Sequence, residues 1–417
     1  MIQRVCRQLD EAGLLSATTI VTNQSQVEIT RNHIGEHIPI VIEPCKRGTF
    51  MAVCSAASYL HTKLSVAVDE TICVLPVDSF VESELFAMLH RLPRLLAESG
   101  TELALIGVKP SHPSTQYGYI VPQVQVPNQN DYYQVTRFIE KPGEELAAEL
   151  ISEHALWNCG IFAFSMRFML ACMIKRGLPV AFDALLEQYE DYPEQSFDVE
   201  VTQKTPQCIV LPYDHIWNDL GDWSVLPSVL EQAVTGNGYV SSDSRNTHII
   251  NENEIPIYVI GLSNTIVAAS PDGILVADKK KSNQIKRLYQ ETRKPMYEEK
   301  RWGTLRVLDD SSANQASTIR KVEFMPGKYT SYHRHVNRKE VWTVLAGDGE
   351  FICNGVKQDI QPGDVLQIPS GVDHAVRASS MLQIIEIRIG EELIEDESIR
   401  AAMNWEDTLR LCGLMPD

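Results

Sequence analysis

The sequence lacks long apolar runs. Nowhere among its 417 residues do about 18 apolar residues follow one another, so no candidate for a membrane-spanning helix is present. The first residues, MIQRVCRQLDEAG, have the pattern of an amphipathic helix and not of a secretory signal. Positive charge is also scarce, because 37 Lys and Arg stand against 55 Asp and Glu and give a formal net charge of −18. A surplus of this sign argues against nucleic acid as a partner.

A regular cysteine framework is absent as well. The nine cysteines are scattered, and several of them (Cys54, Cys73 and Cys172) lie in apolar runs. This distribution argues against a disulfide framework and is typical of reduced, buried thiols. We therefore expect a cytoplasmic protein.

The chain is too long for one ordinary core, and its 44% apolar content is that of a globular protein. We expect three parts, over residues 1–228, 229–290 and 291–417. In the first part, predicted helices (2–12, 24–34 and 51–61) alternate with predicted strands (18–22, 38–43, 71–76 and 103–108). This alternation predicts an α/β, Rossmann-like fold with a mostly parallel sheet covered on both faces. Ligands in such folds bind beyond the carboxyl ends of the strands.

Residues 137–165 carry the most informative pattern. A short apolar strand ends in Glu140-Lys141-Pro142, a helix is predicted over residues 144–152, and the chain returns through Trp157-Asn158-Cys159-Gly160. Glu140 is able to accept hydrogen bonds from hydroxyls, and Lys141 is able to neutralise a phosphate. Asn158 adds a donor and an acceptor, and Gly160 permits close approach of a ligand. The alternative is a solvated turn with a surface ion pair, but the two pieces together favour a site for a polyol phosphate.

Three further segments are candidates for ligand contact. Asp78 follows an apolar strand, as a Mg²⁺ ligand does, but it also has the position of an N-cap for a helix over residues 79–82. In the segment Glu43-Pro44-Cys45-Lys46-Arg47-Gly48-Thr49, Thr49 is placed to cap the next helix, whose N-terminus attracts an anion. A merely structural turn is the alternative there. Tyr117-Gly118-Tyr119 is by itself a hairpin turn.

These segments resemble, in family order, the nucleotidyltransferases, and most closely the mannose-1-phosphate guanylyltransferases. The resemblance implies that Glu140, Lys141, Asn158 and Gly160 hold a hexose 1-phosphate, with Cys159 where a serine is usual. It places Tyr117 and Gly118 at the sugar ring and Glu43 and Arg47 at the nucleotide, although Gly48 replaces an asparagine. It assigns Mg²⁺ to Asp78 and Asp219, the latter in Trp217-Asn218-Asp219-Leu220-Gly221-Asp222-Trp223, which alone indicates only a capped turn with aromatic anchors. Ser196-Phe197-Asp198 also matches a family segment, with Val199 in place of a tyrosine.

One family feature is missing. Nucleotidyltransferases of this type begin with a strand and a Gly-Gly-x-Gly-x-Arg loop, followed by a lysine, which cradle the triphosphate and stabilise charge on the transferred phosphoryl group. The 417 residues contain no such loop. We expect either that this sequence is a truncated reading of a longer gene, or that the protein binds its ligands without catalysing a reaction. We therefore expect the 417-residue chain to be weakly active or inactive.

The remaining chain predicts two β structures. Short strands at 246–250, 255–259, 265–269 and 273–277 indicate a small β-helical or meander segment, and the resemblance implies the left-handed β-helix. The spacing in residues 327–374 resembles the two-part signature of the cupin barrel, and we expect His333, His335, Glu340 and His374 to form a site for Zn²⁺, Fe²⁺ or Mn²⁺. Polar residues lining an empty barrel are the alternative.

Bifunctional guanylyltransferases carry a cupin tail that isomerises mannose 6-phosphate and fructose 6-phosphate. The last part of this chain, residues 291–417, resembles that tail. His333 stands where glutamine is usual and Val341 where histidine is usual, so metal binding can persist without isomerase activity. The sequence thus predicts an enzyme that converts GTP and mannose 1-phosphate to GDP-mannose and pyrophosphate, with a homo-oligomer as one possible state. The alternatives are a non-catalytic sugar-phosphate-binding protein and an isomerase acting through the cupin alone.

Overall fold

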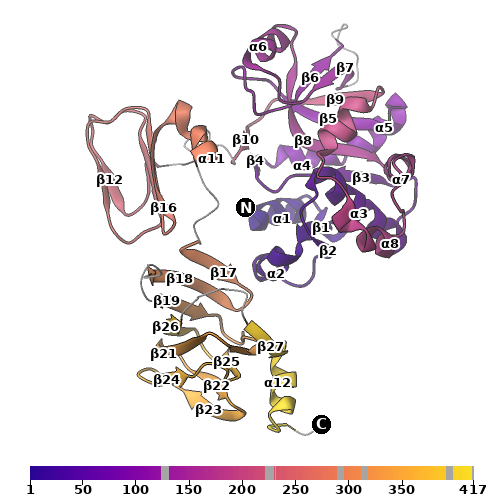
Figure 1. Cartoon of the computed structure of the whole chain (residues 1–417). Helices are drawn as coiled ribbons and strands as arrows, with labels where there is room; N and C mark the ends of the chain where they lie inside the picture. Colours follow the sequence, from indigo (N-terminus) through magenta and orange to yellow (C-terminus); the bar gives the residue numbers. More distant parts are fainter. Residues whose placement is uncertain are drawn as a thin grey trace. The chain divides into compact units, whose positions relative to one another are not determined.

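The computed structural model describes residues 1–123, 131–220, 230, 232–288, 295–310, 317–390 and 398–415. The chain forms two compact units, Met1–Val229 and Leu230–Asp417 (Figure 1). One sequence prediction falls partly outside the described residues: the end of the segment around Asp219, from Gly221 to Trp223. The boundaries expected near residues 228 and 290 also fall there.

The first unit is built on a six-stranded sheet with the order β3-β8-β5-β9-β7-β6. Its strands are β3 (Thr71–Val74), β5 (Leu103–Val108), β6 (Tyr119–Pro122), β7 (Tyr133–Ile139), β8 (Leu156–Ser165) and β9 (Cys208–Tyr213). The predicted α/β fold is confirmed, but the sheet is mixed and not mostly parallel, because only β5 and β9 pair in parallel. The cause is two reversed strands: β8 runs antiparallel between β3 and β5, and β7 runs antiparallel between β9 and β6.

Both faces of this sheet are covered, as the apolar run of β5 predicts. Ala104 and Ile106 point into one core and Leu103 and Leu105 into the other, and all four are buried. The first core is closed by α1 (Ile2–Glu11), α4 (Glu84–Leu89), α5 (Leu92–Ser99) and α6 (Glu144–Ser152). The second is closed by α3 (Gly48–Thr62), α7 (Met166–Lys175), α8 (Phe182–Glu187) and α9 (Phe197–Glu200). The sheet is therefore a rigid base for the loops at its ends.

Two smaller strand pairs belong to the same unit. β1 (Ile20–Asn23) and β2 (Ile40–Glu43) pair in parallel on either side of α2 (Val27–Ile34). β4 (Ser79–Val81) pairs antiparallel with β10 (Trp217–Asp219). Because residues 79–81 form a strand, the alternative that Asp78 caps a helix is wrong.

The second unit begins with the β-helix-like segment that the resemblance implied. Its strands are β11 (Val234–Gly236), β12 (Gly238–Val240), β13 (His248–Asn251), β14 (Ile257–Val259), β15 (Thr265–Ser270) and β16 (Gly273–Asp278). Successive coils stack in parallel through β11-β13-β15 and β12-β14, while β16 turns back antiparallel. The buried Asn251 ties the coils together, because its Nδ2 donates to the carbonyls of Asn237 (2.7 Å) and Ile255 (2.8 Å). The left-handed sense stays a prediction.

A β-barrel of two antiparallel sheets completes the second unit (Figure 1). One sheet has the order β17 (Tyr297–Lys300), β18 (Gly303–Asp310), β19 (Ser317–Phe324), β26 (Leu382–Gly390), β21 (Arg338–Ala346) and β24 (Val365–Ile368). The other has the order β23 (Val356–Ile360), β22 (Gly349–Cys353), β25 (His374–Ala378), β20 (Tyr332–His335) and β27 (Ser398–Ala402). Both sheets contribute to one apolar core, and α11 (Ile285–Leu288) and α12 (Trp405–Leu411) are the helices of this unit among the described residues.

The nine cysteines are all unpaired, and burial raises the pKa of the Cys208 thiol to about 12 and that of Cys73 to about 11. Of the helices in the described ranges, none has both the length and the apolar composition needed to cross a bilayer.

Gly48 offers a test of how α3 is held. Its φ is +78°, and a Cβ there would lie 2.2 Å from the backbone O of Gln195, whereas a Cβ on Gly177 (φ +72°) meets nothing within 4 Å. We expect Gly48→Ala to lower the free energy of unfolding of the first unit by at least about 2 kcal/mol more than Gly177→Ala does, because both carry backbone strain but only the first adds a clash. Urea unfolding of the two variants measures the difference. Equal losses would show that residues 195–198 do not press on the start of α3.

Candidate functional site

Three predicted sugar-site residues meet at the ends of different strands of the first unit. Glu140 follows the end of β7, Asn158 lies near the start of β8, and Gly118 immediately precedes β6. The backbone N of Asn158 donates to the carbonyl of Gly118 at 2.8 Å. A Cβ on Gly118 would lie 2.7 Å from Oε2 of Glu140 and 3.4 Å from Cβ of Asn158. Glycine at residue 118 is therefore what allows the carboxylate and the amide to lie side by side.

The amide of Asn158 already makes two hydrogen bonds. Its Nδ2 donates to Oδ1 of Asp198 at 2.7 Å, and its Oδ1 accepts from the backbone N of Gly160 at 3.1 Å. Gly160 has a φ of +69°, which suits glycine. Asp198 was not among the predicted site residues. The signal for it was the match of Ser196-Phe197-Asp198 to a family segment, which gave no role to the carboxylate.

Lys141 has an unusual backbone conformation beside this cluster. Its φ is +44°, a left-handed value that is rare for a side-chain-bearing residue and costs about 1–3 kcal/mol unless its surroundings enforce it. The Nζ of Lys141 lies 3.4 Å from Oε1 of Glu140, and the lysine side chain is 60% exposed while that of Glu140 is 16% exposed. The ammonium therefore stands at the solvent side of the cluster, where an incoming phosphate can reach it.

Little positive charge lies near Asp198 to stabilise its ionised carboxylate. Burial raises the pKa of Asp198 to about 6, and the nearby negative charge of Glu140 adds to this effect. The hydrogen bond from Asn158 and the charge of Lys141 act in the opposite direction but do not outweigh the increase. Two carboxylates thus share one small volume, an arrangement that is more typical of functional sites than of ordinary surfaces.

The two acids predicted to share a metal are neighbours in the β4–β10 ribbon. Asp219 is the register partner of Ser79, and the backbone N of Leu220 donates to the carbonyl of Asp78 at 3.1 Å. Asp78 is exposed and Asp219 half-buried. The fold thus brings the backbones of these two residues next to each other from distant parts of the sequence. That their carboxylates share a cation stays a prediction.

The acid pair adjoins the sugar cluster through two contacts. The ring of Tyr117, next to Gly118, lies 5.3 Å from the ring of Trp217, which is on the same strand as Asp219. On the other side, a Cβ on Gly160 would lie 3.7 Å from Cγ of Pro76, two residues before Asp78. Both groups therefore line one region of the first unit.

Glu43 and Arg47, predicted to contact a nucleotide, are held by residues 189–195. The hydroxyl of Tyr189 donates to Oε1 of Glu43, and Nη2 of Arg47 donates to the carbonyl of Glu190. Burial raises the pKa of Glu43, an effect that the hydrogen bond from Tyr189 partly offsets. The Nε of Arg47 is buried and has no hydrogen-bond partner among the described residues.

The start of α3 is satisfied by the protein itself. The prediction that Thr49 caps this helix is wrong, because Arg47 is the N-cap and Oγ1 of Thr49 accepts from the backbone N of Phe197 at 2.9 Å. The backbone N of Phe50 donates to the carbonyl of Gln195 at 3.1 Å. This helix N-terminus is thus partly used by residues 195–197 and is less available to an anion than the sequence indicated.

In the barrel, the three predicted histidines converge. His333 and His335 both lie on β20 with their Nε2 atoms 3.1 Å apart, and the ring of His374 lies 4.5 Å from that of His333. Burial, the largest cause, lowers the pKa of His333 to about 4 and that of His335 to about 2. These two imidazoles are therefore neutral at ordinary pH, which is the form that binds metals.

Glu340 joins the histidines but is also the centre of a buried ion-pair network. Its Oε1 lies 3.4 Å from Nε2 of His335 and 2.9 Å from Nε of Arg338. Its Oε2 accepts from Nε1 of Trp342 at 3.1 Å. Burial alone would raise the pKa of Glu340, but the neighbouring His374, whose Nε2 lies 3.6 Å from Oε2, and the charges of Arg388 and Arg338 hold it well below its usual value.

The donors present fit a divalent cation. The ligand atoms of His333, His335 and His374 all lie within 4.8 Å of one another, and Nδ1 of His335 and Nε2 of His374 are buried without a hydrogen-bond partner among the described residues. Three imidazoles beside a carboxylate suit a transition metal. Nη2 of Arg338 lies 2.9 Å from Nε2 of His335, so the guanidinium has to leave that nitrogen when a metal binds it.

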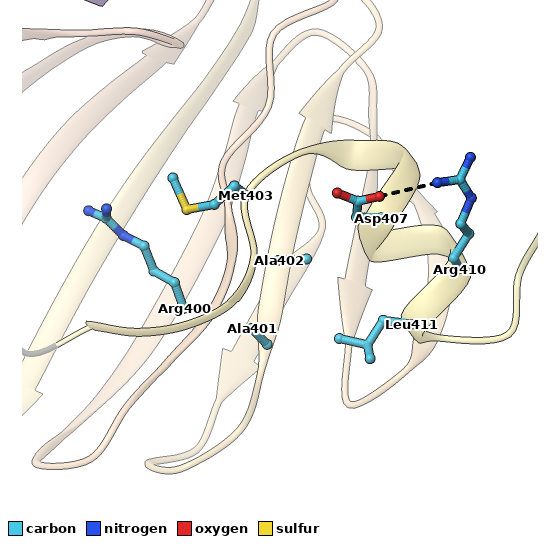
Figure 2. A pocket seen from close by; sticks show the side chains of 7 residues that line it. All are labelled: Arg400, Ala401, Ala402, Met403, Asp407, Arg410 and Leu411. Carbon is cyan, nitrogen blue, oxygen red and sulfur yellow. Dashed lines mark hydrogen bonds and ion pairs between the residues drawn. The ribbon is translucent and has the colours of Figure 1, made fainter. Parts of the chain in front are cut away.

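A hollow in the second unit and an acidic group in the first unit contain none of the predicted site residues. A hollow of about 580 Å³ in the second unit is lined by β27, α12 and the residues between them (Figure 2). Arg410 is turned toward Asp407 there, with 3.3 Å between Nη1 and Oδ1, and no predicted site residue lines it (Figure 2). In the first unit, Glu82, Glu84 and His215 form a mostly exposed group.

Removing Arg338 tests the buried network. Arg338→Met leaves the buried Glu340 without its nearest cation, so we expect the free energy of unfolding of the second unit to fall by about 3–5 kcal/mol. Arg377→Met is the control, because Arg377 is 45% exposed and lies 3.9 Å from Glu350, and such pairs contribute at most about 1 kcal/mol. Thermal and urea unfolding measure both variants. Similar small losses would mean that Glu340 does not depend on Arg338.

Comparison with known proteins relates both parts of the chain to known families. Residues 1–235 match the family model described as nucleotidyl transferase, and residues 320–387 match that of the cupin domain. The chain is 28% identical to mannose-1-phosphate guanylyltransferase ManC of Salmonella typhimurium, over 87% of this chain and 81% of the relative. It is 30% identical to the alginate biosynthesis protein AlgA of Pseudomonas putida, over 86% of this chain and 79% of the relative.

A solved structure of similar fold agrees with these family matches. The crystal structure described as mannose-1-phosphate geranyltransferase from Thermus thermophilus aligns with a TM-score of 0.57 and 27% identity, over 68% of this chain and 88% of that chain. The match to the nucleotidyl transferase model covers more than half of the 417 residues. The chain therefore belongs to the nucleotidyl transferase family and carries a cupin domain in its C-terminal half.

Proposed function

We propose that the first unit carries a mannose-1-phosphate guanylyltransferase site, in which mannose 1-phosphate attacks the α-phosphorus of GTP and pyrophosphate leaves. The observation that carries this proposal is the convergence of Gly118, Glu140 and Asn158 beside the acid pair Asp78 and Asp219. The names of the relatives support the same substrates. Such a transfer depends on positioning and charge neutralisation, which these residues supply.

Each sugar-side residue has a distinct task in this proposal. Glu140 accepts hydrogen bonds from hexose hydroxyls, and Lys141 neutralises the phosphate from the solvent side of the cluster. Asn158 holds the hexose through the part of its amide that the protein leaves unused. The ring of Tyr117 forms a wall with Trp157 at 4.8 Å, and Gly160 allows the substrate to approach the backbone.

The nucleotide side has a metal and two charged residues in this proposal. Asp78 and Asp219 would hold Mg²⁺, which when bound neutralises charge on the phosphates. Glu43 and Arg47 contact the nucleotide, and the unpaired Nε of Arg47 is the group that supports this assignment. The unpaired cysteines are consistent with a cytoplasmic protein.

The test measures pyrophosphate release and binding with the same protein. We expect mannose 1-phosphate to bind in calorimetry and to drive slow, Mg²⁺-dependent pyrophosphate release from GTP. Asp78→Asn and Asp219→Asn should each reduce that release at least about a hundredfold, because each removes a charge that faces the phosphates. Asp183→Asn, which removes an exposed carboxylate paired with Lys63, is the control and should leave the rate unchanged.

Two results of this test would count against the proposal. Binding of mannose 1-phosphate without any pyrophosphate release would favour the alternative of a non-catalytic sugar-phosphate-binding protein. Absence of binding would remove the sugar site altogether.

A second candidate function belongs to the barrel. The cluster of His333, His335 and His374 beside Glu340 supports a divalent metal, and its donors suit Zn²⁺, Fe²⁺ or Mn²⁺. A metal bound there polarises a carbonyl oxygen, which is the chemistry that interconversion of mannose 6-phosphate and fructose 6-phosphate needs. Val341 and His333 depart from the tail that performs this reaction, so metal binding and isomerase activity are separate questions.

Metal analysis answers the first of these questions. We expect purified protein to carry close to one transition metal per chain, and His335→Ala to carry at least about tenfold less, because it removes a ligand at the centre of the cluster. His215→Ala, at an exposed histidine in the first unit, should retain the metal. An assay with mannose 6-phosphate on the same samples tests the isomerase. Equal metal in both variants would assign the metal to another place.

A further inference from the structure

We propose that Asp198 determines which hexose the sugar site accepts, because it fixes the direction in which the amide of Asn158 faces the substrate. The inference rests on the proposed sugar site at Glu140 and Asn158. It makes Asp198 a positioning residue that acts through Asn158. Glu140, Lys141 and Asn158 were predicted from sequence, whereas Asp198 is added by the structure.

The first step is the orientation of the amide. A side-chain amide has two N–H donors and one carbonyl oxygen with two lone pairs. In Asn158 one donor goes to Oδ1 of Asp198, at 2.7 Å, and one lone pair accepts from the backbone N of Gly160, at 3.1 Å. Reversing the amide would turn its oxygen toward the Asp198 carboxylate and its NH₂ group toward an N–H donor. Both new contacts would be repulsive, so a single orientation is stable.

The second step is what this orientation leaves for a ligand. Asn158 retains one N–H donor and one lone pair, each in a fixed direction. Glu140, packed 2.7 Å from the Cβ position of Gly118, offers carboxylate oxygens that act as acceptors when ionised. A hexose hydroxyl forms good hydrogen bonds here only when its O–H points to an acceptor and its oxygen faces the remaining N–H donor of Asn158. Mannose 1-phosphate and glucose 1-phosphate differ only in the direction of one hydroxyl, at C2, and present this hydroxyl differently.

The third step is the rigidity of Asp198. It lies in the first turn of α9, where Oγ of Ser196 accepts from the backbone N of Val199 at 3.2 Å. The preceding Phe197 is fully buried, with its ring 4.8 Å from that of Phe162, and its backbone N donates to Oγ1 of Thr49. Asp198 is therefore held by contacts on both sides of the chain and does not depend on the ligand for its position.

The experiment compares two epimers in the absence of turnover. Calorimetry measures the dissociation constants of mannose 1-phosphate and glucose 1-phosphate for wild-type protein and for Asp198→Asn. The substituted amide can either donate to or accept from Asn158, so residue 198 no longer opposes the reversed amide and only the N–H of Gly160 still favours the original orientation. We expect wild-type protein to prefer mannose 1-phosphate and Asp198→Asn to reduce the preference about three- to tenfold, which is the scale of one hydrogen bond.

Controls separate specificity from folding. Glu194→Gln removes an exposed carboxylate from the same segment, 3.6 Å from Lys46, and should keep the wild-type ratio. Asp198→Ser, whose hydroxyl also donates or accepts, serves if Asp198→Asn does not fold, and thermal unfolding checks each variant. A merely structural role for Asp198 would weaken the binding of both epimers equally and leave the ratio unchanged.

The outcomes distinguish this inference from the proposed function. If wild-type protein binds neither epimer, the sugar site is wrong and the inference fails with it. If wild-type protein binds both epimers equally, or if the two Asp198 variants keep the wild-type ratio, the inference is overturned while the sugar site stands.

Discussion

The backbone hydrogen bond between the N of Asn158 and the carbonyl of Gly118 is the contact on which the sugar-facing cluster depends. It joins the start of β8 to the residue before β6, and Glu140 lies within 2.7 Å of where a side chain at residue 118 would begin. A side chain there would push the carboxylate or the backbone away. The proposed sugar site is therefore a consequence of how two strands meet, and its polar side chains take their positions from that backbone contact.

Residues 189–198 connect this cluster to the start of α3. Tyr189 and the carbonyl of Glu190 hold the two residues expected at the nucleotide. The carbonyl of Gln195 accepts from the first turn of α3, and Asp198 holds the amide of Asn158. Much of the hydrogen-bonding capacity of the predicted site is thus used within the protein. Such internal bonds orient a side chain before the ligand arrives, so less order has to be imposed when it binds.

The sequence predicted the parts of this site that lie within short motifs. Glu140, Asn158 and Gly160 belong to one stretch around a helix, and the bounds of β5 and α6 follow from local patterns. It did not predict the insertion of β8 between β3 and β5, because alternation of helices and strands contains no information on strand order. A local pattern also predicted that the Thr49 side chain caps the helix that follows it. Its hydroxyl instead accepts from the backbone N of Phe197, a residue far along the chain that the pattern does not contain. Asp198 was passed over because its role exists only next to Asn158.

The two units show how the number of cations around a buried carboxylate decides its behaviour. Glu340 has Arg338 and Arg388 beside it, so its pKa lies well below the usual value in spite of burial. Asp198 has Glu140 as a neighbour and only the solvent-facing Lys141 in opposition, so burial prevails and its pKa rises. A phosphate bound at Lys141 would take up that lysine's charge and leave the carboxylates less compensated. In the proposed sugar site, hexose hydroxyls and the donor of Asn158 would then stabilise the carboxylates, so binding of the sugar ring would be coupled to binding of its phosphate.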